Sequence, residues 1–273
     1  HSVSWSQSKI EDTTEYMSAY DDSLTLKRMT YVPSIDNVNG VYSKAINEKL
    51  QQLIEKNHKW DFISGNAISA SINPEDLIAN PKTVKAISKD LNADGFFISE
   101  LRKDPKEVKI HLYLFSTRSG ELITEAELKR PTDNTEVVQV AIQSLFRRIL
   151  EKIPYDAMIV SRTDNRVTIN AGKRDGVIAG QNLNAVKIVG AKKHPKRKFI
   201  LKSHKALLGQ LRIVKVDDYL SFADIVSESE AGVITTNTKV TGISKIHYQA
   251  TPWTKNYTPP EQLLSEDNKV VFG

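Results

Sequence analysis

The sequence predicts an α+β fold, in which a β-α-β-α-β-β-β-α domain is followed by a small β-barrel. Residues 24–154 alternate strand-like segments with amphipathic helical stripes, whereas residues 155–243 contain short strands and no helical period. The ends differ from both, because residues 1–23 are polar and residues 244–273 contain three prolines. We therefore expect a peripheral N-terminal segment, two domains and an extended, surface-docked tail.

The first predicted strand and helix occupy residues 26–32 and 40–57. The helix is indicated by apolar residues three and four positions apart, at Tyr42, Ile46, Leu50, Leu53 and Ile54. Farther along, Asn73-Pro74 and Asn80-Pro81 each place a capping Asn before a Pro that suits the first helical turn. These pairs predict two further helical starts, and the helices are expected to pack on a sheet.

A group of strands and a long helix complete the first domain. Residues 108–115 are apolar at every second position, the period of a strand with one well-buried face. A turn at 118–120 joins them to the same alternation over 122–128, which predicts a hairpin, and residues 95–101 supply an adjacent strand. A continuous apolar stripe predicts a helix over 134–152.

The second domain consists of short strands at close spacing. They are predicted at 157–161, 167–170, 181–189, 208–216, 220–226 and 239–243. Five or six short strands in so few residues favour closure into a small barrel of the SH3 or OB type, and we assign an SH3-like barrel.

Motifs for catalysis are missing from the sequence. There is no cysteine, which excludes disulfides, thiolate catalysis and Cys-ligated zinc. The six histidines lack metal-ligand spacing, and no phosphate-cradling or nucleophile motif is present. We therefore predict a protein that is not an enzyme, with no catalytic residue, metal or cofactor.

Positive charge is concentrated in one segment. Residues 176–216 contain ten Lys and Arg and no Asp or Glu, although the whole chain has 38 basic and 33 acidic residues. A concentrated field attracts anions better than the same charge spread out. The segment falls largely on the longest predicted barrel loop, whose candidate anion-binding residues are Lys192, Lys193, Lys196, Arg197, Lys198, Lys202 and Lys205. The alternative to an anion-binding role is a solvated loop whose charges only keep it soluble. The apolar centre of the loop at 199–201 instead suggests that part of it is a strand or packs against a partner.

One stretch of the barrel carries a recognisable signature. Residues 165–181, NRVTINAGKRDGVIAGQ, resemble the turn-rich strand of the small C-terminal barrel in the bacterial flagellar assembly protein T family. Val177 and Ile178 are expected to cap the barrel core. Three glycines are expected to supply positive φ for consecutive tight turns: Gly172, Gly176 and Gly180.

The first domain resembles the TolB N-terminal fold, also found in the curli secretion lipoprotein and in lipoprotein activators of peptidoglycan synthases. The matching segments are the first strand and helix, together with residues 91–99, LNADGFFIS. These resemblances imply a non-enzymatic protein of the Gram-negative periplasm that docks to envelope components such as a flagellar ring or cell-wall machinery.

Two functions follow from these observations. The first is an envelope scaffold or assembly factor whose basic loop meets an envelope protein, peptidoglycan or a lipid anion; an oligomer is left open. The second is a polyanion or nucleic-acid binding protein that uses the basic barrel loop. Nucleic acid is disfavoured, because Phe199 is the one aromatic residue in 176–216 that could stack on a base. No apolar run approaches the roughly 18 residues of a membrane span. The chain opens at His1 without Met, which indicates a processed or trimmed protein, so a signal peptide or lipid anchor could lie upstream.

Overall fold

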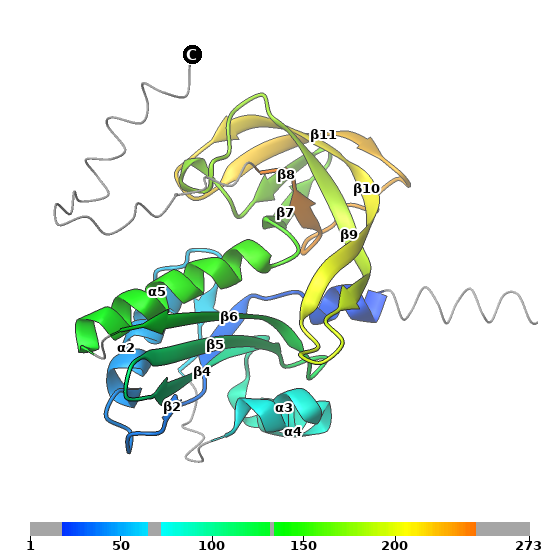
Figure 1. The fold of residues 1–273 in the computed structure, drawn as a ribbon. Helices are drawn as coiled ribbons and strands as arrows, with labels where there is room; N and C mark the ends of the chain where they lie inside the picture. Colours follow the sequence, from blue (N-terminus) through cyan, green and yellow to red (C-terminus); the bar gives the residue numbers. More distant parts are fainter. Residues whose placement is uncertain (1–17, 65–71, 132–133, 244–273) are drawn as a thin grey trace, which may run out of the picture.

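The computed structural model describes residues 18–64, 72–131 and 134–243. The predicted extended tail and most of the predicted N-terminal segment lie outside these residues. Within them, a mixed sheet flanked by helices is followed by a barrel, and a long hairpin of the barrel reaches back to the sheet (Figure 1).

The first domain follows the predicted element order with two differences: one short extra strand, and two consecutive helices where the order has a single one. Its elements are β1 (Arg28–Tyr31), β2 (Ile35–Asp36), α2 (Ser43–Glu55), β3 (Asp61–Phe62), α3 (Pro74–Ala79), α4 (Pro81–Leu91), β4 (Gly95–Lys103), β5 (Val108–Ser116), β6 (Leu122–Arg130) and α5 (Thr135–Lys152). Strand β1 lies between β3 and β4 and is parallel to both, whereas β4, β5 and β6 run antiparallel. The prolines that open α3 and α4 follow Asn73 and Asn80, whose side chains cap the helices as the sequence predicts.

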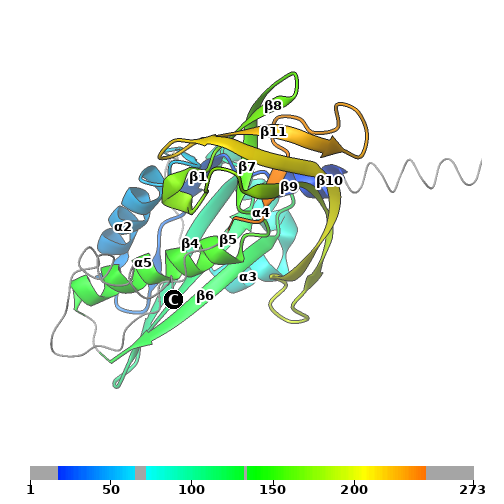
Figure 2. The same ribbon diagram turned by 90° about the horizontal axis from the view of Figure 1, so that it is seen from above.

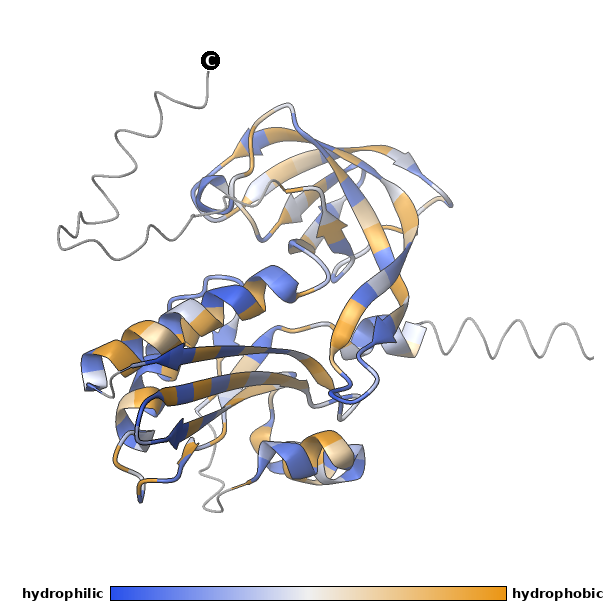
Figure 3. Ribbon diagram, in the orientation of Figure 1, coloured by the Kyte–Doolittle hydropathy of each residue, from blue (hydrophilic) through white to orange (hydrophobic). Residues whose placement is uncertain are grey.

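The sheet buries both faces because its strands alternate. On β4, Phe97 packs with α2 and α5, whereas Phe96 and Ile98 pack with α3 and α4 on the opposite face. Figure 3 shows the same alternation of hydrophobic and hydrophilic residues along β5 and β6. Toward the other end of the second face the side chains of β4, β5 and β6 are polar, and they form the site described below.

Asp94, which precedes Gly95 at the start of β4, has a structural role. Asp94 is buried, and its Oδ2 accepts hydrogen bonds from the N–H groups of Arg28 (2.9 Å) and Lys27 (3.2 Å). Burial raises the pKa of Asp94, but the hydrogen bonds from Arg28 and Lys27 outweigh it and leave the pKa lowered. The carboxylate thereby fixes the start of β1 beside β4.

The second domain is a closed barrel with strand order β10-β11-β8-β7-β12-β9. Its strands are β7 (Ala157–Thr163), β8 (Arg166–Ile169), β9 (Asn182–Lys193), β10 (Ile200–Val216), β11 (Ser221–Glu228) and β12 (Lys239–Thr241), with a 3₁₀ turn at Lys173–Asp175. Alternate residues of these strands face a separate barrel core, which includes Ile159, Leu211 and Ala223.

The prediction that the basic segment forms a long loop is wrong, because most of the segment belongs to strands β9 and β10. Strands β9 and β10 pair from Asn182 and Arg212 up to Lys193 and Ile200, so only residues 194–199 form a turn. We call residues 187–208 the arm. Figures 1 and 2 show it leaving the barrel and ending beside the first domain, near β6. The apolar centre at 199–201 did indicate a strand correctly.

Several exposed apolar side chains have a common cause in β-bulges. Leu201, Val214 and Val226 each fall at a register shift in a ladder of β10. Val160 falls at a shift between β7 and β8. A bulge adds one residue to one strand, so two neighbours leave the strict in-and-out alternation and an apolar residue is left facing solvent.

The glycine-rich signature is only partly explained by positive φ. Gly176 and Gly180 have φ of +88° and +85°, as predicted. Gly172 does not, with φ of −137°, and a Cβ there would lie 2.3 Å from the carbonyl oxygen of Asp217. Gly172 is therefore required by the close approach of two backbones. The expectation for Ile178 is also wrong, because Val177 is buried but Ile178 is 69% exposed.

Replacing Gly172 by Ala is expected to lower the free energy of unfolding by about 2 kcal/mol, because two backbone segments must move apart. Gly180→Ala should cost about 1 kcal/mol, since its φ is positive but the space around it is open. Gly190→Ala is the matched control, with ordinary φ and open space, and should change stability little. Urea unfolding of the three variants measures the order of their losses of stability. Equal losses of stability for the substitutions at 172 and 190 would contradict the close-approach explanation.

Candidate functional site

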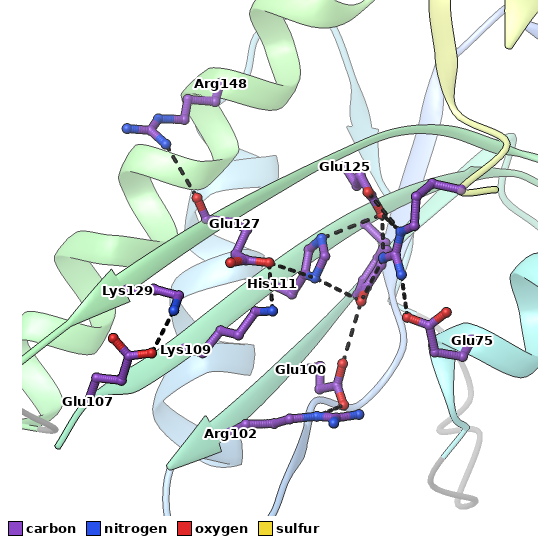
Figure 4. A network of polar contacts seen from close by, with 12 residues as sticks. Glu75, Glu100, Arg102, Glu107, Lys109, His111, Glu125, Glu127, Lys129 and Arg148 are labelled. Carbon is purple, nitrogen blue, oxygen red and sulfur yellow. Dashed lines mark hydrogen bonds and ion pairs between the residues drawn. The ribbon is translucent and has the colours of Figure 1, made fainter. Parts of the chain in front are cut away.

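The turn of the arm inserts a cation into the outer face of the sheet. Arg197 Nη2 lies 2.7 Å from Glu125 Oε2 on β6, and its Nε lies 3.0 Å from Glu125 Oε1. Its Nη1 lies 2.6 Å from Glu75 Oε1 at the start of α3. One guanidinium thus joins the barrel to a strand and a helix of the first domain (Figure 4).

The turn conformation holds Arg197 in this position. Lys198 adopts the left-handed region with φ of +64°, and the N–H of His194 donates to the carbonyl of Phe199 (2.8 Å). The N–H of Arg197 donates to His194 Nδ1 (3.0 Å), and the His194 ring stacks on Phe199 with centroids 5.0 Å apart. Phe199 in turn packs against the apolar core under α3 and α4. The turn is therefore docked by packing as well as by charge.

Arg197 closes a polar cavity of about 440 Å³ over the sheet. His111 Nε2 lies 3.4 Å from Glu125 Oε2, and His111 Nδ1 lies 3.0 Å from the hydroxyl of Tyr113. The other carboxylates of the cavity also have cations within 4 Å, in the pairs Glu100–Arg102 (2.6 Å) and Glu127–Lys109 (2.9 Å). His111 lies on the less buried face of β5, with its side chain 12% exposed. Among the described residues no group of three or more His, Asp and Glu side chains could hold a metal ion.

Glu125 is the electrostatic centre of this cluster. Burial raises the pKa of its carboxyl, but hydrogen bonds from His111 and Arg197 outweigh burial and bring the pKa to about 2. Hydrogen bonds to Glu125 likewise raise the pKa of Arg197. Burial also raises the pKa of Tyr113, whose hydroxyl lies 3.4 Å from Arg197 Nη2. Glu125 and Arg197 therefore both stay charged at neutral pH.

The predicted binding residues divide into two sets. Arg197 is engaged by Glu125 and Glu75, and Lys193 lies 2.6 Å from Glu121, so both serve contacts within the chain. The second set is exposed and has no salt bridge to a carboxylate in the described part of the chain. It consists of Lys192, Lys196, Lys198 and Lys202. Lys205 lies farther along β10, opposite Ile188, and is exposed.

Two of the exposed lysines face each other. Lys202 is the ladder partner of Lys192, and two residues farther on His204 is the partner of Gly190 on the same face. Like charges directly opposite one another across two strands destabilise the pairing. We call Lys192 and Lys202, with Lys196 and Lys198 at the turn, the cationic face of the arm.

A second contact between the domains was missed by sequence reasoning. Lys239 on β12 is fully buried, and its Nζ lies 2.6 Å from Asp21 Oδ2 and 2.7 Å from Thr25 Oγ1. Asp21 Oδ1 also accepts the N–H of Ile188 (2.7 Å). Residues 18–23 form a helical turn at this point, so this part of the predicted peripheral segment lies between the domains.

A third contact lies on the other side of the molecule. Asp175, in the 3₁₀ turn of the barrel, lies 2.9 Å from Lys59 Nζ and 3.0 Å from His58 Nε2. Burial raises the pKa of Asp175, but hydrogen bonds from His58 and Lys59 and the charge of Lys59 outweigh it, so the pKa is lowered. With the arm and Lys239, this contact fixes the barrel against the first domain at three separate places.

Comparison with known proteins gives no family. No family model matches the chain, and no curated protein matches it. Among solved structures, lipoprotein GNA1162 from Neisseria meningitidis has a TM-score of 0.32 and 11% identity, covering 45% of this chain and 95% of that one. The LpoB C-terminal domain from Salmonella enterica has a TM-score of 0.29 and 14% identity, covering 39% and 83%. TolB from Acinetobacter baumannii has a TM-score of 0.31 and 9% identity, covering 74% and 60%.

All three TM-scores lie below 0.5. Among the described residues no helix has the length and apolar character that crossing a membrane would require.

Proposed function

We propose that this chain is a non-catalytic docking protein of the cell envelope, which holds an anionic envelope component on the cationic face of the arm. The observation that carries the proposal is the opposed pair Lys192 and Lys202. The pair opposes strand pairing in the isolated chain, and an anion placed between the two ammonium groups would remove that repulsion.

The fold supports a docking role because it fixes the arm at both ends. Arg197 and Lys193 tie the end of the arm to Glu125, Glu75 and Glu121, while the barrel holds its base. A partner therefore meets lysines on a ladder that is already ordered, and less conformational entropy is lost on binding than with a free loop.

The envelope location rests on the sequence. The resemblance of residues 26–57 and 91–99 to TolB-type domains, and of 165–181 to the flagellar assembly protein T barrel, supports a periplasmic protein with an SH3-like barrel. Anchoring as a lipoprotein and service to a flagellar ring or to cell-wall machinery belong to the same proposal.

The test measures binding of poly-glutamate to the full chain by fluorescence anisotropy at low salt. The variant K192Q/K202Q should bind roughly fivefold more weakly, since each exposed ion pair contributes up to about 1 kcal/mol. The control is K82Q/K89Q, which removes the same charge from exposed positions on α4 and should bind like the wild type.

Equal affinity of both variants would overturn the proposed site. A single-stranded oligonucleotide serves as the second probe. If it binds more tightly than poly-glutamate and depends on the same two lysines, the nucleic-acid function replaces the docking function.

A further inference from the structure

A second cavity, away from the arm, lies at the junction of the two domains. Its volume is about 310 Å³, and apolar side chains from α2, α5 and β7 form its walls, including Leu53, Phe146 and Met158. Trp60 adds an aromatic wall, with its ring centroid 6.0 Å from that of Phe146. Apolar cavities at domain interfaces, with a few polar groups, are common ligand sites, and this volume is at the small end of their range.

One polar group of the lining lacks a partner. Asn170 is 7% exposed, and its Oδ1 accepts the N–H of Met158 (2.6 Å). Its amide nitrogen makes no hydrogen bond to any described residue. The nitrogen is not among the fully buried atoms that lack a partner, so it is accessible from the cavity that Asn170 lines and can donate to a ligand oxygen there.

The rim of the cavity has a surplus of donors. Lys59 Nζ donates to the carbonyl of Asp156 (2.8 Å) and lies 2.9 Å from Asp175 Oδ1, which leaves it one further proton. Lys56 is exposed and has no carboxylate partner in the described parts of the chain.

The carboxylates of the rim are already engaged. Asp175 is held by His58 and Lys59, and Asp156 Oδ2 accepts the N–H groups of Gly242 (2.9 Å) and Ile243 (3.1 Å). Asn170, Lys59 and Lys56 therefore keep hydrogen-bond donors for a ligand, and the two lysines are positively charged.

We propose that this junction cavity binds a small apolar molecule that carries a carboxylate. The chain or ring of the ligand lies against Trp60, Phe146 and Met158, and its oxygens accept hydrogen bonds from Asn170, Lys59 and Lys56. Because the walls come from both domains, the bound ligand stabilises the junction. This site is independent of the cationic face of the arm.

The test compares three ligands with the same chain and different head groups: octanoate, octanol and octylamine. Titration calorimetry on the full chain should show saturable binding of octanoate, roughly tenfold weaker binding of octanol and no binding of the amine. Octanoate should also raise the melting temperature, because it binds only the folded state.

Two variants probe the donors, and one serves as control. Asn170→Asp keeps the oxygen that Met158 requires and replaces the free amide by a carboxylate, so octanoate affinity should fall at least tenfold. Lys56→Gln, at an exposed position that does not threaten folding, should lower the affinity roughly threefold. Lys44→Gln, at the far end of α2, should leave it unchanged.

The proposal would be overturned if octanoate and octanol bound equally well, or if Lys56→Gln left the octanoate affinity unchanged. The cavity would then be filled by water alone. If Asn170→Asp does not fold, the comparison of the three head groups and the Lys56→Gln variant still test the proposal. K192Q/K202Q should bind octanoate like the wild type, which separates failure of this site from failure of the docking function.

Discussion

Replacing Lys239 by Met is expected to lower the free energy of unfolding by about 3 kcal/mol. All three protons of the Lys239 ammonium have acceptors, namely Asp21 Oδ2 (2.6 Å), the Asp21 carbonyl (2.9 Å) and Thr25 Oγ1 (2.7 Å). Removing the ammonium leaves the Asp21 carboxylate, only 13% exposed, without a counter-ion. For a protein of this size the melting temperature should fall by about 6–12 °C, which differential scanning calorimetry measures.

The partner substitution separates a lost charge pair from lost packing. In the double variant D21N/K239M no unpaired charge remains, so the loss should be smaller than for Lys239→Met alone. The control is Lys187→Met, because Lys187 is only half-buried and its Nζ contacts Ser18 Oγ rather than a carboxylate. A melting temperature for Lys239→Met equal to that of Lys187→Met would show that the buried pair does not hold the domains together.

The elements that local sequence determines were predicted well. The helix predicted over 134–152 is α5 at Thr135–Lys152, and Asn134 caps it through Glu136 N–H. Apolar periodicity and capping residues act over a few positions, so a sequence shows them directly. Strand β10 was predicted eight residues short, because its first half alternates little and is held by pairing with β9.

The contacts that build the site could not be predicted, because they join distant positions. Arg197 meets Glu125 and Glu75 from 72 and 122 residues away, and Lys239 meets Asp21 across 218. No spacing rule connects such residues. The sequence shows that residues 176–216 contain no Asp or Glu, but it does not show that the sheet supplies carboxylates to this segment.

The same distance explains why Asp21 falls in the segment that the sequence predicts to be peripheral. The partner of the Asp21 carboxylate is Lys239, in the three-residue strand β12. Nothing in the sequence around this Lys indicates that it is buried. The apolar centre of the basic run was the useful clue, since Phe199 and Ile200 pack against the cores of the first domain, whereas Leu201 faces solvent.

Glu125→Gln is expected to lower the free energy of unfolding at neutral pH by about 3 kcal/mol, and this difference from the wild type should vanish in acid. The pKa of Glu125 is about 2 in the folded protein against an ordinary value of 4.5, so its carboxylate stabilises the fold above pH 4.5. That contribution is lost as the pH falls through 4.5 toward 2.

The measurement is the melting temperature of both proteins across this pH range. Other carboxylates with lowered pKa, such as Asp94 and Asp175, titrate in both proteins and cancel in the difference. Glu48→Gln, on the exposed face of α2, is the control and should follow the wild type at every pH.

The pH dependence decides what the arm contact is. If Arg197 and Glu125 hold the arm on the sheet, the wild type and Glu125→Gln must converge in acid, since protonated Glu125 and Gln are both neutral toward Arg197. Curves that stay parallel down to the lowest pH would mean that Glu125 contributes through packing alone. The arm would then be positioned by Phe199 and its apolar neighbours, and the cationic face would keep its orientation in acid as well as at neutral pH.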